Sequence, residues 1–254
     1  MTDLAQALLG ARAYDLEQPR YAGAPVFPAH EPGVLLHLHR RHERGLGEAR
    51  TSASALLVMA EHSGTHIDAL CHQAENLELY GGVRVDAQVQ TPEGFTQLGI
   101  DTVPPLFARG VLLDCADAGH AIGADALERA AEGLEIGAGD VILIRTGAGA
   151  LWHDREAFLA AGGIDASGSR WCAERRPLAV GADNVAWDVP GQDDPELGSL
   201  PGHLILLVRE GIHIIEALNL EALARDGVRE FAFACLPLKL RGGTGSPVRP
   251  IALV

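Results

Sequence analysis

The sequence predicts an α/β protein from the way its apolar residues are distributed. Between residues 110 and 236, apolar runs of strand length alternate with segments of helical spacing. This alternation is typical of α/β folds. Apolar residues make up 47% of the 254 residues, which suffices for a sizeable core. The first third is richer in bends and more β-like. Because no repeat or low-complexity linker interrupts the chain, we expect one domain, residues 1–254.

The N-terminal segment, residues 1–33, is predicted to be an arm followed by a loop. Residues 2–13 are interpreted as a short helix or arm, and prolines at positions 19, 25, 28 and 32 then mark a loop. A long loop in a compact enzyme is typically a lid, a pocket wall or a dimer arm. Because Tyr21, Val26 and Phe27 are too apolar for a free loop, we expect the segment to pack on a neighbouring subunit.

The remaining elements follow from apolar periodicity and from helix-ending residues. The run 53–59 is expected to be a buried strand that leads into residues 62–72. The run 201–210 is ambiguous by periodicity, and we interpret it as a helix that ends at Gly211. The predicted strands are 34–39, 53–59, 110–114, 141–145, 179–181, 212–215 and 231–236. The predicted helices are 124–132, 152–161, 169–176, 201–210 and 220–225.

Composition excludes several classes of function. The net charge of −14 argues against a nucleic-acid surface and against an anionic membrane. No window approaches ~18 uninterrupted apolar residues, so no membrane-spanning helix is expected. The first ten residues lack the basic region of a secretory signal. The four cysteines form no C-x-x-C pair and are expected to be reduced and mostly buried, as in a cytoplasmic protein.

Three histidines and one aspartate lie within eleven residues, as His62, His66, Asp68 and His72. Imidazole nitrogen and carboxylate oxygen are ligands that zinc and manganese accept. In an extended strand His62 and His66 would lie roughly 13 Å apart, too far for one ion. The chain must therefore bend between them, and Gly64 tolerates the backbone angles that a bend requires. This spacing predicts a divalent metal site.

The chemistry of such a site is hydrolytic. If His62, His66 and Asp68 bind a metal, the open fourth position makes the site catalytic rather than structural. Water in that position is acidified on zinc to a pKa of about 7, which supplies hydroxide at neutral pH. His72, four residues beyond Asp68, is interpreted as the general acid and base. The alternative, that His72 is itself a ligand, remains open.

Residues 62–72 resemble the signature H-x-G-T-H-x-D-x-P-x-H of the metal-dependent cyclase-type amidohydrolases. This family includes bacterial kynurenine formamidase and isatin hydrolase. Leu70 replaces the proline of the signature, a departure associated with the isatin-hydrolase side of the family. The resemblance continues through residues 181–184, 201–203, 215–216 and 242–249, and so covers nearly the whole chain.

The resemblance implies a swivelling β/β/α fold with a mixed, partly barrel-like sheet. It also implies that His203 and Glu216 complete a dinuclear site in which Asp68 is the bridging ligand, so the cofactor is one or two ions of zinc or manganese. From the residues alone, a salt-bridged strand end remains an alternative explanation of Glu216. His213 is left out because alternation places it on the opposite face from Glu216.

The expected function is a metal-dependent hydrolase that opens an amide, lactam or ester bond of a small, aromatic substrate through metal-activated water. Trp187 is the candidate substrate-binding residue because it follows the conspicuous segment 181–184. Two alternatives stay open: a non-catalytic metal- or ligand-binding protein, and a dehydratase or cyclase on the same fold. With an arm like those of the resembling enzymes, we expect a homodimer or homotetramer.

Overall fold

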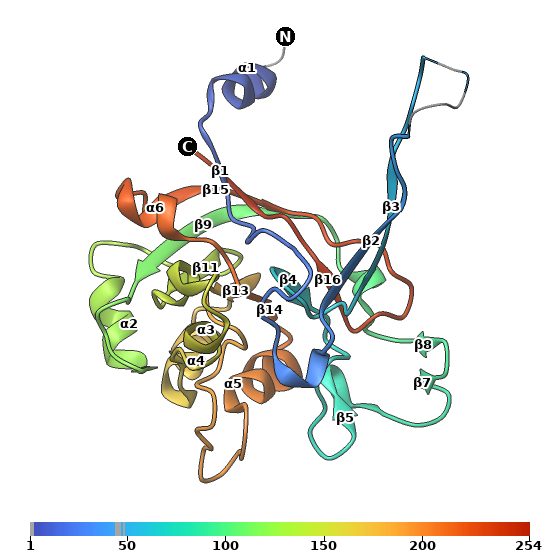
Figure 1. Ribbon diagram of the computed structural model, residues 1–254. Coiled ribbons are helices and arrows are strands. Elements are labelled where there is room, and N and C mark those ends of the chain that lie inside the picture. Colours follow the sequence, from blue (N-terminus) through green and yellow to red (C-terminus); the bar gives the residue numbers. More distant parts are fainter. Residues whose placement is uncertain (1–2, 44–46, 48) are drawn as a thin grey trace.

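A nine-stranded mixed sheet organises the computed structural model, which describes residues 3–43, 47 and 49–254 (Figure 1). The strand order is β1-β17-β15-β9-β11-β13-β14-β4-β16. In that order the bounds are Ala13–Asp15, Ile251–Leu253, Glu230–Cys235, Leu106–Asp114, Val141–Arg145, Ala179–Ala182, His213–Glu216, His66–Asp68 and Gly245–Pro247. The sheet curls into a half-barrel, which confirms the expected mixed, partly barrel-like α/β architecture.

The centre of the sheet is parallel and its two ends are antiparallel. Strands β9, β11, β13 and β14 run parallel, and all other neighbouring strands in the sheet are antiparallel. Alternate residues of the parallel strands enter two separate cores: Leu113 and Ile144 pack with helices α2 and α4, whereas Leu112 and Leu143 pack inside the curl. Burial on both faces explains why these strands are continuous apolar runs in the sequence.

The helices are short and follow the strands. They are α1 (Asp3–Gly10), α2 (Ala124–Ala130), α3 (Arg155–Leu159), α4 (Ala166–Glu174), α5 (Pro201–His203), which continues as a π-helix over Leu204–Glu210, and α6 (Glu221–Arg225). Single 3₁₀ turns span Pro28–His30, Tyr80–Gly82, Ile100–Thr102 and Ala148–Leu151. Four two-stranded sheets complete the set: β2–β3 (Val34–Arg40, Ser54–Met59), β5–β6 (Glu78–Leu79, Val83–Arg84), β7–β8 (Gln90–Thr91, Gly94–Phe95) and β10–β12 (Ala121–Ile122, Gly163–Ile164).

Most of the predicted elements are confirmed, with shifted ends. The predicted helix 169–176 begins earlier, at Ala166, because the Asp165 carboxylate accepts the Gly168 N–H and caps it. The predicted helix 152–161 shortens to α3, which the Asp154 side chain caps. The helix predicted for 201–210 is present and ends at Gly211 in a left-handed conformation. The arm predicted for residues 2–13 becomes α1 and β1, and Thr2 lies outside the described residues.

The proline-rich segment packs on its own chain. Val26 is buried, and the Trp152 indole donates a hydrogen bond to the Pro19 carbonyl at 3.0 Å. Phe27 packs in a small core with Trp152 and Phe158. The same chain covers Val26 and partly covers Tyr21 and Phe27, so contact of this segment with a neighbouring subunit stays a prediction.

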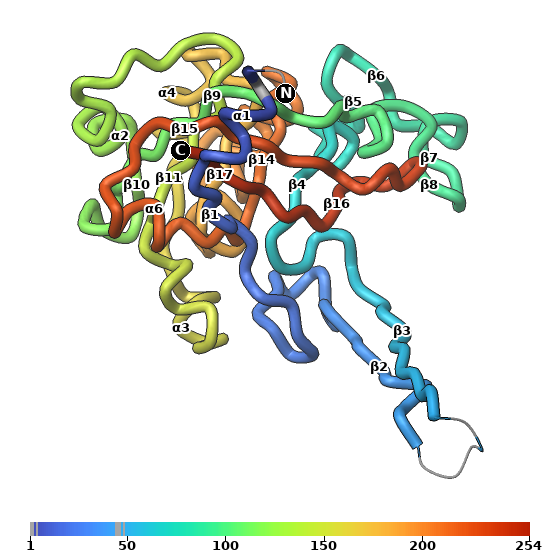
Figure 2. Tube along the Cα trace, turned by 90° about the horizontal axis from the view of Figure 1, so that it is seen from above, coloured from blue at the N-terminus to red at the C-terminus, as the bar shows by residue number. Residues whose placement is uncertain are grey.

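The second strand of the β2–β3 hairpin corrects another prediction. The run 53–59 does form a strand, but the hairpin projects from the body of the molecule, and the side chains of Leu56, Leu57 and Val58 are exposed (Figures 1 and 2). Burial fails because β3 pairs with β2 alone and neither strand joins the large sheet.

Two further expectations concern the whole chain. All four cysteines are buried and free, as predicted. Over the residues that the structure describes, none of the helices has the length and apolar character needed to cross a membrane.

Candidate metal centre

Strand β4 brings three distant segments of the chain together. It lies between β14 and β16, with His66 opposite Glu216 on one side and Asp68 opposite Gly245 on the other. The bend expected before β4 is present, because Gly64 has a φ of +63°. The Arg20 guanidinium holds this bend by donating to the carbonyls of Ser63 and Thr65. The sequence motif therefore enters the sheet with its side chains directed into the interior.

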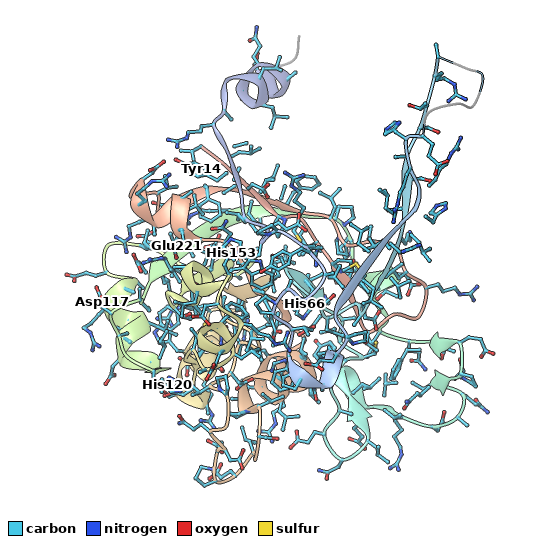
Figure 3. The ribbon with its side chains drawn as sticks, viewed as in Figure 1. Tyr14, His66, Asp117, His120, His153 and Glu221 are labelled. Carbon is cyan, nitrogen blue, oxygen red and sulfur yellow. The ribbon has the colours of Figure 1, made fainter. Side chains whose placement is uncertain are left out.

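Five predicted ligands converge on one buried space. The His66 Nε2 lies 3.3 Å from Glu216 Oε2 and 3.6 Å from Asp68 Oδ1. The His203 Nε2 lies 3.3 Å from Glu216 Oε1 and 3.7 Å from Asp68 Oδ2. The His62 Nδ1 lies 2.8 Å from Asp68 Oδ1. All five side chains are buried, and Figure 3 shows His66 near the middle of the molecule.

The polar atoms of this space lack the partners that burial requires. Within the described part of the chain, His62 Nδ1, both carboxylate oxygens of Asp68 and Glu216 Oε1 are buried without a hydrogen bond of acceptable geometry. Buried polar atoms in this state carry a large desolvation cost unless something else satisfies them. The His62 nitrogen and the Asp68 oxygen lie 2.8 Å apart with no hydrogen bond of acceptable geometry, so both fit as neighbouring ligands of one cation at bond lengths of about 2 Å.

Two of the histidines are held in the tautomer that a metal needs. The His66 Nδ1 lies 2.7 Å from the Gly64 carbonyl, and the His203 Nδ1 lies 2.7 Å from Asp188 Oδ2. A carbonyl and a carboxylate accept hydrogen bonds only, so each Nδ1 carries the proton. Each Nε2 faces Asp68 and Glu216, and it offers its lone pair to a metal once it has lost its proton.

The electrostatics of the cluster favour positive charge. Burial alone would raise the pKa of Asp68, but the neighbouring histidines, His72 foremost, hold it well below its usual range. Burial would lower the pKa of His203, but the nearby carboxylates of Asp188 and Glu216 raise it well above its usual value. The carboxylates thus favour protonated imidazoles, and a divalent cation would displace those protons on binding.

His72 lies beside the ligands, stacked on the His62 ring at 4.0 Å between centroids and 6.0 Å from the His203 ring. Its Nε2 accepts a hydrogen bond of 3.3 Å from the Gln73 amide. Burial, followed by the charges of His62 and His203, lowers its pKa to about 3, so the ring is neutral. The prediction from sequence assumed an ordinary histidine pKa, and burial beside other imidazoles changes that value.

Among the residues that the structure describes, three groups of side chains have ligating atoms within 4.8 Å of one another. They are His62 with His66 and Asp68, Asp68 with His72 and His203, and His30 with His62 and His72. The second group keeps open the alternative that His72 is a ligand. His30 is a residue that sequence reasoning missed: its ring stacks on His62 at 4.8 Å. It comes from the proline-rich segment, where no spacing motif marks it.

Trp187 does not line this space. Its side chain is fully buried in the core beside β13, and its indole N–H donates to Ser169 Oγ at 3.0 Å. The prediction that Trp187 binds substrate is therefore corrected, because packing against α4 leaves no face of the ring free. His213 was rightly left out, since its Nδ1 donates to the Asp68 carbonyl rather than facing the cluster.

Comparisons with known proteins agree with this geometry. A family model described as "Putative cyclase" matches residues 14–189. The kynurenine formamidase of Paracidovorax citrulli is 27% identical over 240 residues, which cover 94% of each chain. The isatin hydrolase of Roseibium aggregatum is 27% identical over 243 residues, which cover 91% of this chain and 84% of that protein.

Among solved structures, a crystal structure described as a novel cyclase superposes with a TM-score of 0.84. It is 30% identical and covers 98% of this chain and 88% of the other. The family model spans more than half of the chain, and the solved relative extends the match across the segments that carry His203 and Glu216. This chain therefore belongs to the cyclase family.

Proposed function

We propose that this protein is a metal-dependent hydrolase that opens a non-peptide C–N bond, or a related ester bond, of a small aromatic substrate. One observation carries the proposal: three imidazoles and two carboxylates enclose a buried space in which four polar atoms have no hydrogen-bond partner among the described residues. The relatives named kynurenine formamidase and isatin hydrolase support a substrate with an amide or lactam bond beside an aromatic ring.

The ligand geometry supports two metal positions. Glu216 directs Oε2 towards His66 and Oε1 towards His203, and Asp68 likewise directs Oδ1 towards His66 and Oδ2 towards His203. One or two divalent ions would therefore be held by His62, His66, Asp68, His203 and Glu216. Nitrogen and oxygen donors of this kind suit zinc or manganese. Bound there, a divalent cation would polarise the substrate carbonyl and acidify a water molecule.

The chain's own residues supply orientation and proton transfer. The buried carboxylates hold charge where water is excluded, which strengthens their interaction with a cation. His72 lies alongside as a neutral imidazole, which can take a proton from the attacking water and return it to the leaving nitrogen. His30, stacked on His62, lies beside the same space and belongs to a segment that covers it.

The experiment that tests the function is metal analysis of the purified protein together with a hydrolysis screen of isatin, N-formylkynurenine and simple lactones. We expect one or two equivalents of zinc or manganese per chain and turnover of at least one amide or lactam that chelator treatment abolishes. A protein that retains no metal after metal-replete purification, or binds metal and hydrolyses none of these classes, contradicts the proposal.

We further propose that residues 1–254 form a single hydrolase domain that works as a homodimer or homotetramer. The exposed apolar hairpin β2–β3 is the element that we assign to the contact between subunits. A cytoplasmic location is supported by the four free, buried cysteines, because disulfides are rare in reducing compartments.

A further inference from the structure

The glycine-rich loop near the C-terminus closes over the start of the motif. Thr244 Oγ1 lies 2.8 Å from His62 Nε2, and both the hydroxyl and the backbone N–H of Thr244 donate to Glu61 Oε1. The glycines on either side of Thr244 leave no spare room: a Cβ added to Gly245 would lie 2.6 Å from His62 Cε1, and one added to Gly243 would lie 2.7 Å from Glu61 Oε2. The loop is therefore shaped around these two side chains.

The chemistry of the three groups sets the direction of each hydrogen bond. The Glu61 carboxylate accepts only, so the single hydroxyl proton of Thr244 must be directed at Glu61. The Thr244 oxygen then has only lone pairs to offer to His62. His62 Nε2 must therefore carry the imidazole proton, and Nδ1 is left with its lone pair.

That lone pair faces the space already described. His62 Nδ1 lies 2.8 Å from Asp68 Oδ1 and is one of the buried atoms of the described chain with no hydrogen bond of its own. His66 and His203 each donate a hydrogen bond from Nδ1, whereas His62 donates one from Nε2. His66 and His203 thus face the centre through Nε2 and His62 through Nδ1, and each ring is fixed by a different partner.

We infer that Thr244 and Glu61 are positioning residues that fix the tautomer and ring orientation of His62 for metal binding. The inference rests on the proposed function, since it concerns the affinity of the same site. Loss of a hydrogen-bonding partner of a metal ligand typically weakens metal affinity about 10–100-fold. The glycine-rich loop therefore takes part in metal binding without supplying a ligand.

The test compares three variants of the full-length protein by competition of zinc with a chromogenic chelator. Thr244→Val keeps the shape of the side chain and removes the acceptor, so the dissociation constant for zinc should rise about 10–100-fold. Thr244→Ser restores the hydroxyl and should stay within about threefold of wild type. Thr51→Val is the matched control, because Thr51 Oγ1 lies 2.7 Å from His42 Nδ1 in an exposed threonine–histidine pair. Equal zinc affinity of wild type and Thr244→Val overturns the inference.

A second measurement keeps the inference testable should Thr244→Val fail to fold. In ¹⁵N-labelled wild-type protein, the ring-nitrogen shifts of His62 report which nitrogen carries the proton. A proton on Nε2 in both the metal-free and the zinc-bound protein agrees with the inference, and a proton on Nδ1 in the zinc-bound protein overturns it. Wild type that binds no zinc at all contradicts the proposed function instead, so the two failures are distinguishable.

Discussion

His66 and His72 lie six residues apart and are assigned different tasks at the same centre. His66 directs Nε2 at both Asp68 and Glu216, whereas His72 stacks on the edge of the cluster and contacts Gln73. We expect His66→Ala to lose metal and activity together, because it removes a ligand. We expect His72→Ala to keep its metal while kcat falls about 10²–10⁴-fold, the usual contribution of general acid–base catalysis.

Metal content by mass spectrometry and kcat on the same preparations separate these roles. If His72→Ala also loses its metal, His72 is a ligand, in line with its group with Asp68 and His203. If His72→Ala turns over as fast as wild type, the acid–base role is wrong.

Gly64 supplies a second prediction about a single residue. Its φ of +63° disfavours any side chain, and an added Cβ would lie 2.6 Å from Arg20 Nη1. We expect Gly64→Ala to lower the free energy of unfolding by about 1–2 kcal/mol for the backbone conformation alone. Displacement of Arg20 should weaken metal binding as well.

The matched control for Gly64 is Gly81→Ala. Gly81 has a φ of +72°, but nothing lies within 4 Å of an added Cβ. Urea unfolding and zinc affinity measured on both variants distinguish backbone strain from loss of the Arg20 contact. Weakened zinc binding in both variants to the same extent would contradict the role assigned to Arg20.

At the scale of the elements, the β2–β3 hairpin exposes large apolar side chains to solvent, which is unfavourable for a free monomer. Leu36 and Leu57 lie opposite each other in the register and are 60% and 53% exposed. A projecting apolar strand pair of this kind is typical of a protein interface. We expect the double variant Leu36→Lys, Leu57→Lys to shift the protein from dimer or tetramer to monomer in light scattering at micromolar concentration.

Leu151→Lys, an exposed leucine on a separate 3₁₀ turn, should leave the assembly unchanged. A wild-type protein that is already monomeric at this concentration would show that the hairpin has another partner. The proline-rich segment is not varied in this test, because Val26 is buried and Tyr21 and Phe27 are partly buried within the chain.

At the scale of the whole molecule, metal binding should stabilise the fold. A ligand that binds only the folded state contributes about 2.7 kcal/mol at 100 times its dissociation constant. For a domain of this size, about 2–4 °C in Tm accompany each kcal/mol, so chelation should lower Tm by about 5–10 °C. Calorimetry with and without chelator measures the shift, and a single transition in both states also agrees with one domain. A Tm that chelation leaves unchanged contradicts a metal held by buried ligands.

The sequence by itself determined the chemistry of the motif, because His62, His66, Asp68 and His72 lie within eleven residues and carry donor atoms that divalent metals accept. It also determined the parallel core: β11 has the predicted bounds, since residues buried on both faces leave a continuous apolar run. The resemblance to the amidohydrolases added His203 and Glu216, which spacing alone could not connect to the motif.

Only the tertiary structure decided which distant residues meet. The pairing of β4 with β14 and β16 places Glu216 and Thr244 against the motif, and strand neighbours depend on long-range packing rather than on local pattern. Burial could not be predicted from the sequence either. Trp187 is buried and the side chains of β3 are exposed, although both are apolar. Exposure depends on which element lies next to a side chain. His30 joins the site for the same reason, since the fold of the proline-rich segment, and no motif, brings its ring to His62.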